Sequence, residues 1–240
     1  MKYLILGSNS FSGSSFIKKL LQKKNKVIAV SRSAELSKTF QPYFKYKNKE
    51  NFKFYKIDIN KDLKKLFKII EKEKPKIVVN FAAQSMVDQS WENPNHWYQT
   101  NILSSVNIVN KLQNYSFFKK FINFSTPEVY GNNNRWIKEN INFNPTTPYA
   151  ISRSAFDQYL LLLNKFKKFP VIFTRASNVY GPSQKLYRII PKLIMQIEKK
   201  QIFNLHGNGK SKRSFIHIDD VSDALLILSK KGKIGETYHI

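Results

Sequence analysis

Tyr149 and Arg153 are the two residues whose types and spacing point most directly to acid–base chemistry. Pro148 precedes them, and proline is favoured in the first turn of a helix, so both side chains are expected on one helix face. A fixed cation lowers the pKa of a neighbouring tyrosine, which can then exchange a proton with a hydroxyl group. On its own this spacing is more often structural, so the pair needs support from elsewhere in the chain.

A second polar group, Ser125-Thr126-Pro127-Glu128, directly follows an apolar stretch at 121–124. Open α/β sheets build their ligand sites at the carboxyl ends of strands. If the stretch is a strand, a hydroxyl and a carboxylate stand at such an end. A surface loop would give the same pattern.

Gly7 and Gly13 lie between the first predicted strand and the first predicted helix, where doubly wound folds bind the pyrophosphate of a dinucleotide. Glycine permits the tight turn and the close approach of the backbone, although an ordinary strand–helix turn can carry the same residues. An acidic residue that would bind the ribose of NAD is missing after the second strand, where Ser31-Arg32-Ser33 stand instead. Arg32 can face the 2′-phosphate of NADP, so the sequence favours NADP over NAD, unless Arg32 is only a surface residue.

Strands and helices alternate through the first 175 residues, and the strands are continuous apolar runs. Both features predict a doubly wound parallel sheet, a Rossmann fold, covered by helices on both faces. We expect a dinucleotide-binding domain at 1–175 and a partial substrate-binding lobe at 176–240, interleaved with it, in a chain that looks truncated after the final strand. The predicted strands are 2–7, 26–31, 52–57, 76–81, 121–125, 171–175, a short one near 202–205 and the last from 237; the predicted helices are 13–23, 61–74, 97–112, 148–166, and those near 188–200 and 219–230.

The composition excludes several classes of protein. The 240 residues contain no cysteine, which rules out disulfides and thiolate chemistry and fits a cytoplasmic location. No apolar run is long enough to span a membrane. The net charge of +25 comes from scattered lysine pairs without a basic, aromatic-rich stripe, so a nucleic-acid partner is not expected. The four histidines lack metal-ligand spacing, so no metal site is predicted.

Motifs along the whole chain resemble those of the extended short-chain dehydrogenase/reductase family, of the epimerase/dehydratase type, and most of all its nucleotide-sugar 4,6-dehydratases. The order and spacing of the motifs are specific for the family and less specific for the reaction. The matching segments are the glycine turn at 7–13, Asp58-Ile59, 80–85 (NFAAQS), Thr100-Asn101, 125–131 (STPEVYG), 147–149 (TPY), 178–182 (NVYGP) and 213–220 (RSFIHIDD).

The resemblance implies a role for each matching residue. Thr126 and Tyr149 would hold the C4 hydroxyl of a hexose, Tyr149 as the base, and Arg153 would replace the family's active-site lysine. Glu128 would remove the C5 proton, so that water leaves from C6 and a 4-keto-6-deoxy sugar forms. Helices 97–112 and 149–166 would pair two copies into a homodimer. NAD or NADP would be held by Gly7, Asn9, Ser10, Phe11, Gly13, Arg32, Asp58, Ile59, Ala82, Ala83, Tyr149 and Arg153, and the nucleotide sugar by Gln84, Ser85, Asn178 and Arg213.

Three residues depart from the family pattern. Ser10 replaces the middle glycine of the turn, so its side chain must point away from a bound pyrophosphate. Pro127 stands where a proton donor is often found, which leaves Glu128 or a water to protonate the departing hydroxyl. Arg153 keeps the positive charge of lysine but carries it on a wider, planar head. Two other functions stay open: a nucleotide-sugar 4-epimerase or 4-reductase, and an inactive protein that binds a dinucleotide or a polyanion.

Overall fold

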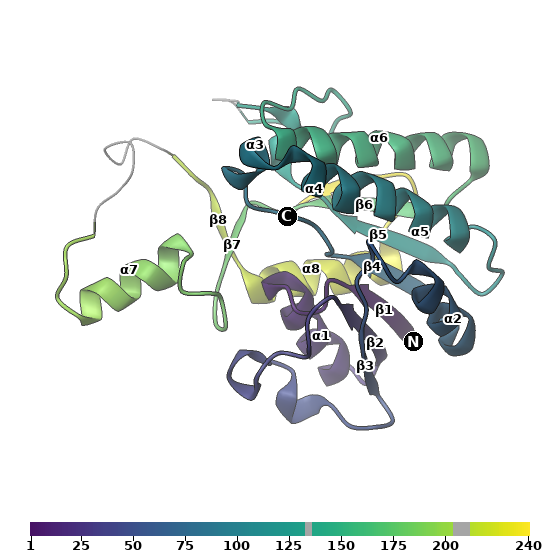
Figure 1. Ribbon diagram of the computed structural model, residues 1–240, viewed down its shortest axis with the longest axis horizontal. Coiled ribbons are helices and arrows are strands. Elements are labelled where there is room, and N and C mark those ends of the chain that lie inside the picture. The colour runs from purple at the N-terminus through teal and green to yellow at the C-terminus, as the bar shows by residue number, and fades with distance from the viewer. Residues whose placement is uncertain (133–135, 204–211) are drawn as a thin grey trace.

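Seven parallel strands form the main sheet in the order β3-β2-β1-β4-β5-β6-β9 (Figure 1). The computed structural model describes residues 1–132, 136–203 and 212–240. This strand order reverses between β1 and β4, which is where doubly wound sheets open a crevice for ligands. The strands of the main sheet are β1 (Lys2–Leu6), β2 (Lys26–Ser31), β3 (Phe52–Lys56), β4 (Ile77–Asn80), β5 (Lys120–Phe124), β6 (Val171–Arg175) and β9 (Thr237–His239).

Helices cover both faces of the sheet, as the apolar strands predict (Figure 1). Side chains alternate along each strand, so Leu4 and Leu6 enter one hydrophobic core and Tyr3 and Ile5 the other. The first core lies beneath α2 (Leu63–Glu73), α5 (Ser105–Leu112) and α6 (Pro148–Lys167). The second lies beneath α1 (Phe11–Gln22) and α8 (Ile218–Lys231). Across the described residues, no helix is long and apolar enough to cross a membrane.

The chain after residue 175 is divided between two places. A small parallel sheet of β7 (Asn178–Tyr180) and β8 (Phe215–His217), together with α7 (Ile189–Glu198), projects from the main body (Figure 1). In contrast, α8 packs beside α1, and β9 pairs with β6 at the edge of the main sheet. The sequence did not predict β7 or β8, whereas the last strand predicted from 237 is confirmed as β9. The strand expected near 202–205 is wrong at 202–203, which are irregular, and the rest of it lies outside the described residues.

The helix predicted at 97–112 is broken by a π-helical turn, η3 (Gln99–Ser104), between α4 (Pro94–Tyr98) and α5. A short helix, α3 (Gln89–Glu92), precedes α4. The hydroxyl of Ser105 donates a hydrogen bond to the carbonyl of Thr100, five residues earlier, which fits the wider turn. Wide turns of this kind are frequent at functional sites, and this one places Asn101 in the interior.

Candidate functional site

The turn between β1 and α1 is built around two glycines that cannot carry a side chain. Gly7 has a φ of +76°, and a Cβ added there would lie 2.6 Å from the backbone nitrogen of Ala82, just beyond β4. A Cβ on Gly13 would lie 2.6 Å from the carbonyl oxygen of Gly7. The loops after β1 and β4 therefore meet in direct backbone contact at the point where the strand order reverses.

We expect Gly7→Ala to destabilise the protein and to abolish dinucleotide binding. The left-handed backbone costs a residue with a side chain about 1–3 kcal/mol, and the backbone of Phe81 and Ala82 must also move. Gly235→Ala is the matched control, because Gly235 also has a positive φ of +88° but faces only the side chain of Asn164. Urea unfolding and cofactor titration of both variants check the prediction. Equal cofactor affinity in the two variants would contradict it.

Ser10 begins α1 as its N-cap. Its hydroxyl accepts a hydrogen bond from the backbone N–H of Gly13 at 3.0 Å, so the side chain is turned into the helix. Phe11 follows as the first helical residue and packs against the second hydrophobic core. The backbone N–H groups of Phe11 and Ser12 in the first turn have no partner inside the helix. They lie at the positive end of the helix dipole, where an anion is favoured.

Residues from the neighbouring loops surround this turn. The side-chain amide of Asn9 donates to the Ser33 hydroxyl at 2.9 Å and to the Ala34 carbonyl at 2.7 Å, which ties the loop after β1 to the loop after β2. The oxygen of the same amide is buried and has no hydrogen-bond partner in the described structure. Arg32 is exposed beside this tie.

Two of the residues expected to hold the dinucleotide, Asp58 and Ile59, follow β3. Asp58 is half-buried, and its carboxylate accepts a hydrogen bond from the backbone N–H of Asn60 at 2.9 Å. Ile59 lies in the first hydrophobic core with an exposed fraction of 7%. Most of the Ile59 side chain is therefore used for packing, and a ligand would meet little more than its edge.

Asn101 fixes the loop that follows β4, a role that the sequence analysis did not assign to it. Its side-chain oxygen accepts from the backbone N–H of Gln84 at 2.9 Å, and its nitrogen donates to the Gln84 carbonyl at 3.1 Å. The same nitrogen donates to the hydroxyl of Ser152 on α6 at 2.9 Å. Ala82 and Ala83 are half-buried in this loop, and Ser85 is exposed at its end.

The structure brings Tyr149, Thr126 and Arg153 together. The side chains of Tyr149 and Thr126 are hydrogen-bonded to each other, and the positive charge of Arg153 acts on the Tyr149 hydroxyl. Arg153 is buried and donates a hydrogen bond to the carbonyl of Phe124 at the end of β5, while its Nε lacks a partner in the described chain. The backbone N–H of Tyr149 donates to the Ser90 hydroxyl at 3.2 Å, which anchors the start of α6.

The pKa of Tyr149 is higher than normal, contrary to the sequence-based expectation. Burial of the phenol raises this pKa and is the largest influence, and the negative charge of Glu128 raises it further. Arg153, the Thr126 hydrogen bond and Arg188 lower it without cancelling the burial. Arg188 is an exposed residue directly before α7 and is not among the predicted site residues, although the sequence shows a basic residue before this helix.

Glu128 lies in the short 3₁₀ turn η4 (Pro127–Tyr130) that Thr126 caps by accepting the N–H of Glu128 at 3.3 Å. Glu128 is an exposed residue of the surface. Partial desolvation by the neighbouring protein still raises the pKa of its carboxyl group, and the guanidinium of Arg213 lowers this pKa in part. Arg213 is itself exposed, beside Asn178, whose amide donates to the carbonyl of Ser214 at 3.1 Å. A carboxylate with a raised pKa thus faces a cation next to a tyrosine–threonine pair.

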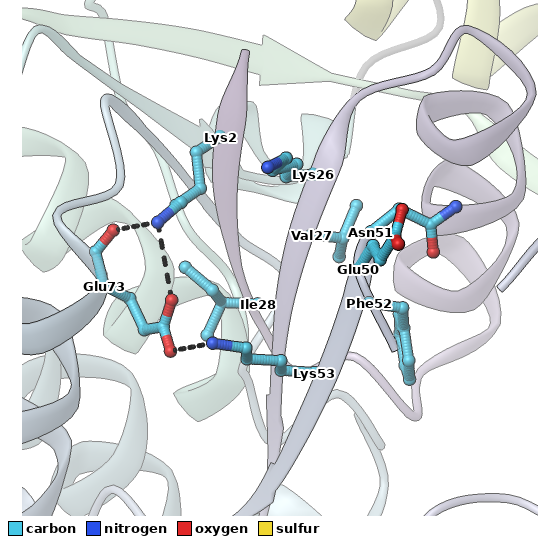
Figure 2. Close-up of a pocket in the computed structure, with 9 residues that line it drawn as sticks. All are labelled: Lys2, Lys26, Val27, Ile28, Glu50, Asn51, Phe52, Lys53 and Glu73. Carbon is cyan, nitrogen blue, oxygen red and sulfur yellow. Dashed lines mark hydrogen bonds and ion pairs between the residues drawn. The ribbon is translucent and has the colours of Figure 1, made fainter. Parts of the chain in front are cut away.

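A separate cavity of about 90 Å³ lies at the amino ends of β1, β2 and β3, at the far edge of the sheet (Figure 2). Glu73 is buried there and binds the ammonium groups of Lys2, at 3.4 Å, and Lys53, at 2.7 Å. The hydroxyl of Tyr55 donates to the same carboxylate at 3.2 Å. These contacts compensate the buried charge of Glu73, and the predicted site residues all lie elsewhere.

Known proteins with similar sequences and folds place the chain in a family. The model of the NAD dependent epimerase/dehydratase family matches residues 3–240. The chain belongs to this family. It is 37% identical over 252 residues to the dTDP-D-glucose 4,6-dehydratase of Dictyostelium discoideum, and the match covers 100% of this chain and 58% of that protein. The chain thus spans little more than half the length of this curated relative.

Two solved structures, one of a dehydratase and one of an epimerase, share the fold of this chain. The dTDP-glucose 4,6-dehydratase of Bacillus anthracis in complex with NAD superposes with a TM-score of 0.87 at 28% identity, covering 100% of this chain and 75% of that one. The UDP-glucose 4-epimerase of Thermotoga maritima with UDP-glucose superposes with a TM-score of 0.85 at 27% identity, covering 100% and 76%. The fold is therefore common to dehydratases and epimerases and does not by itself distinguish the two reactions.

Proposed function

We propose that this chain carries the cofactor site and the catalytic residues of a nucleotide-sugar 4,6-dehydratase, which converts an NDP-hexose to an NDP-4-keto-6-deoxyhexose. The observation that carries the proposal is the placement of Glu128 beside Thr126, whose hydroxyl accepts the Glu128 N–H, with the charges of Glu128 and Arg153 both acting on Tyr149. The dehydratase names among the relatives support it. A 4-epimerase has no need of a carboxylate base here, because it only returns hydride to the other face of the same ketone.

The residues at the β1–α1 turn fit a dinucleotide. The backbone contacts at Gly7 and Gly13 leave no space for side chains, the first turn of α1 presents N–H groups, and the buried oxygen of Asn9 lacks a donor in the described structure. The nicotinamide of the cofactor would supply a reversible hydride acceptor. Arg32, in place of an acidic residue, favours NADP. Comparing the NADP and NAD affinities of the wild type and Arg32→Ala tests this preference.

For oxidation at C4, Tyr149 would take the proton of the C4 hydroxyl at its phenolate oxygen. The Thr126 hydroxyl, which is hydrogen-bonded to Tyr149 in this structure, would hydrogen-bond the same C4 hydroxyl of the substrate. Arg153 and Arg188 favour the phenolate, and burial opposes it. Once C4 is a ketone, the C5 proton becomes acidic.

For loss of water, Glu128 would remove the C5 proton at its carboxylate while the C6–oxygen bond breaks. The departing hydroxyl needs a proton, and Pro127 has none to give. A Glu128 whose pKa is raised by desolvation can keep the proton from C5 and deliver it to the C6 oxygen, which leaves as water. When hydride then returns to C6, C5 takes up a new proton from solvent, and the proton that Tyr149 took from the C4 hydroxyl is released to solvent. Arg213 and Asn178 would bind the diphosphate of the substrate.

Incubation of the full-length protein with dTDP-glucose, GDP-mannose, UDP-glucose and CDP-glucose, followed by mass spectrometry, tests the proposal. No external reductant is needed, because the hydride taken from C4 returns to C6. Loss of one water from any of the four supports the dehydratase and identifies the nucleotide. Unchanged masses with a changed sugar configuration would instead establish the epimerase.

A homodimer is part of the proposal. Helix α6 exposes Ile151, Leu162 and Phe166, and the adjoining turn η3 exposes Leu103. Large apolar side chains gathered on neighbouring helices mark surfaces that bind another protein. Sedimentation analysis of the wild type and of Phe166→Asp tests the pairing, which predicts a dimer that the substitution dissociates.

The pH dependence of turnover is expected to report the pair of Glu128 and Arg213. A base must be deprotonated, so kcat/KM should fall as the pH drops through the pKa of Glu128, which desolvation raises from its ordinary value. Because Arg213 lowers this pKa, Arg213→Ala should move the acidic limb to higher pH. Lys212→Ala, which changes an adjacent exposed cation, is the control. An acidic limb at the same pH in both variants would contradict the pairing.

A further inference from the structure

A buried ion pair lies directly behind the proposed site. Asp157 is one turn beyond Arg153 on α6, and Arg175 ends β6; their side chains are 0% and 1% exposed, with 3.0 Å between Oδ2 and Nη2. Tyr149, Arg153 and Asp157 follow one another at intervals of four residues, so all three lie on the same face of α6.

The carboxylate of Asp157 holds the end of β5 just before Thr126. It accepts hydrogen bonds from the Ser125 hydroxyl at 2.7 Å and from the side-chain amide of Asn123 at 2.7 Å. Ser125 also donates its backbone N–H to the carbonyl of Thr174 at 2.8 Å. The residue that precedes Thr126 is therefore fixed through both its side chain and its backbone.

Arg175 holds the other side of the same segment. Its guanidinium lies 4.7 Å from the centre of the Tyr130 ring and donates hydrogen bonds to the Tyr130 hydroxyl and, at 3.1 Å, to the carbonyl of Asn140. Tyr130 comes two residues after Glu128 in η4. The ion pair thus contacts the chain before Thr126 and after Glu128.

The hydrogen bonds around Asp157 extend further, to the loop after β4. The side-chain oxygen of Asn123 accepts from the amide of Asn80 at 3.4 Å, and the oxygen of Asn80 accepts from the backbone N–H of Ala82 at 3.2 Å. Asp157 is therefore connected, through two asparagines, to the loop that faces Gly7.

A buried ion pair is a weak source of stability, because desolvation of both charges offsets their attraction. Here each charge also holds a segment that carries a proposed catalytic residue. We infer that Asp157 and Arg175 are positioning residues that fix Thr126 and Glu128 relative to Tyr149. This role rests on the proposed function, and neither residue would touch the substrate.

Ser125→Ala is the variant that tests this role, because it removes one link to Asp157 and leaves the ion pair intact. We expect the single-turnover rate of C4 oxidation to fall about tenfold, as for loss of one hydrogen bond to a charged group, with KM changed less than twofold. Ser222→Ala, which removes a buried serine hydroxyl from α8, should leave the rate unchanged. In a Thr126→Ala background the Ser125 substitution should have no further effect. An equal loss in both backgrounds would overturn the inference.

A measurement made without substrate tests the positioning role independently of the proposed reaction. The methyl group of Thr126, labelled for NMR, should be rigid in the wild type and in Ser222→Ala and mobile in Ser125→Ala. If the wild type converts none of the four nucleotide sugars, the proposed function fails, and the Thr126 methyl still decides the positioning role. An equally rigid methyl in all three proteins would overturn it.

Discussion

Tyr149→Phe is expected to lose C4 oxidation by a factor on the order of 10²–10⁴, the usual contribution of general acid–base catalysis. The phenol of Tyr149 is the hydroxyl on which the site's polar groups converge. The hydrogen bond with Thr126 and the positive charge of Arg153 both favour its phenolate form, against the effect of burial. Phenylalanine keeps the ring in place and removes only the hydroxyl. The measurement is single-turnover appearance of the near-ultraviolet absorbance of a reduced nicotinamide after substrate is added.

Tyr159→Phe provides the matched control for this variant. Tyr159 lies on the same helix, and its hydroxyl donates a hydrogen bond to Asn110 at 2.6 Å, away from the proposed site. Its loss should leave the rate of oxidation within about twofold of the wild type. A Tyr149→Phe variant that oxidises substrate as fast as Tyr159→Phe would remove Tyr149 from the mechanism.

The architecture of the main sheet could be predicted from sequence because it depends on local, repeated signals. Strands buried on both faces appear as continuous apolar runs such as 26–31, and the structure has β2 at Lys26–Ser31. Proline at position 148 marked the start of α6, which the structure confirms. The family match over residues 3–240 confirms the resemblance that the motifs indicated.

The electrostatics of the site could not be predicted in the same way. Arg153 was visible in sequence as a cation near Tyr149, but the extent of burial, which outweighs that charge, depends on tertiary packing. Arg188 is 39 positions from Tyr149 along the chain, and only the fold places its charge near the phenol. Asp157 could likewise not be predicted as a partner of Ser125, because their hydrogen bond joins α6 to the residue that follows β5, 32 positions away in the chain.

Glu128→Gln is the variant that separates dehydration from every other reaction of this fold. Glutamine keeps the size of the side chain and cannot accept the C5 proton, so water loss should slow by a factor on the order of 10²–10⁴. C4 oxidation should continue, because Tyr149 and Thr126 are untouched. The raised pKa of Tyr149 should also fall slightly, since the negative charge of Glu128 contributes to it. The expected signature is therefore an accumulated 4-keto hexose that still carries its C6 oxygen.

Two measurements read that signature directly. Mass spectrometry distinguishes the 4-keto hexose, which keeps its C6 oxygen, from the product that has lost water. In deuterated water the C5 position should take up deuterium in the wild type and not in Glu128→Gln. Glu71→Gln is the control, because the Glu71 carboxylate binds Tyr115 at 2.8 Å on the outside of α2 and should affect neither step. A Glu128→Gln enzyme that dehydrates normally would show that another group removes the C5 proton. A wild type that oxidises C4 but never exchanges C5 would move the chain to the 4-epimerases, because rotation of a ketone needs no base at position 128.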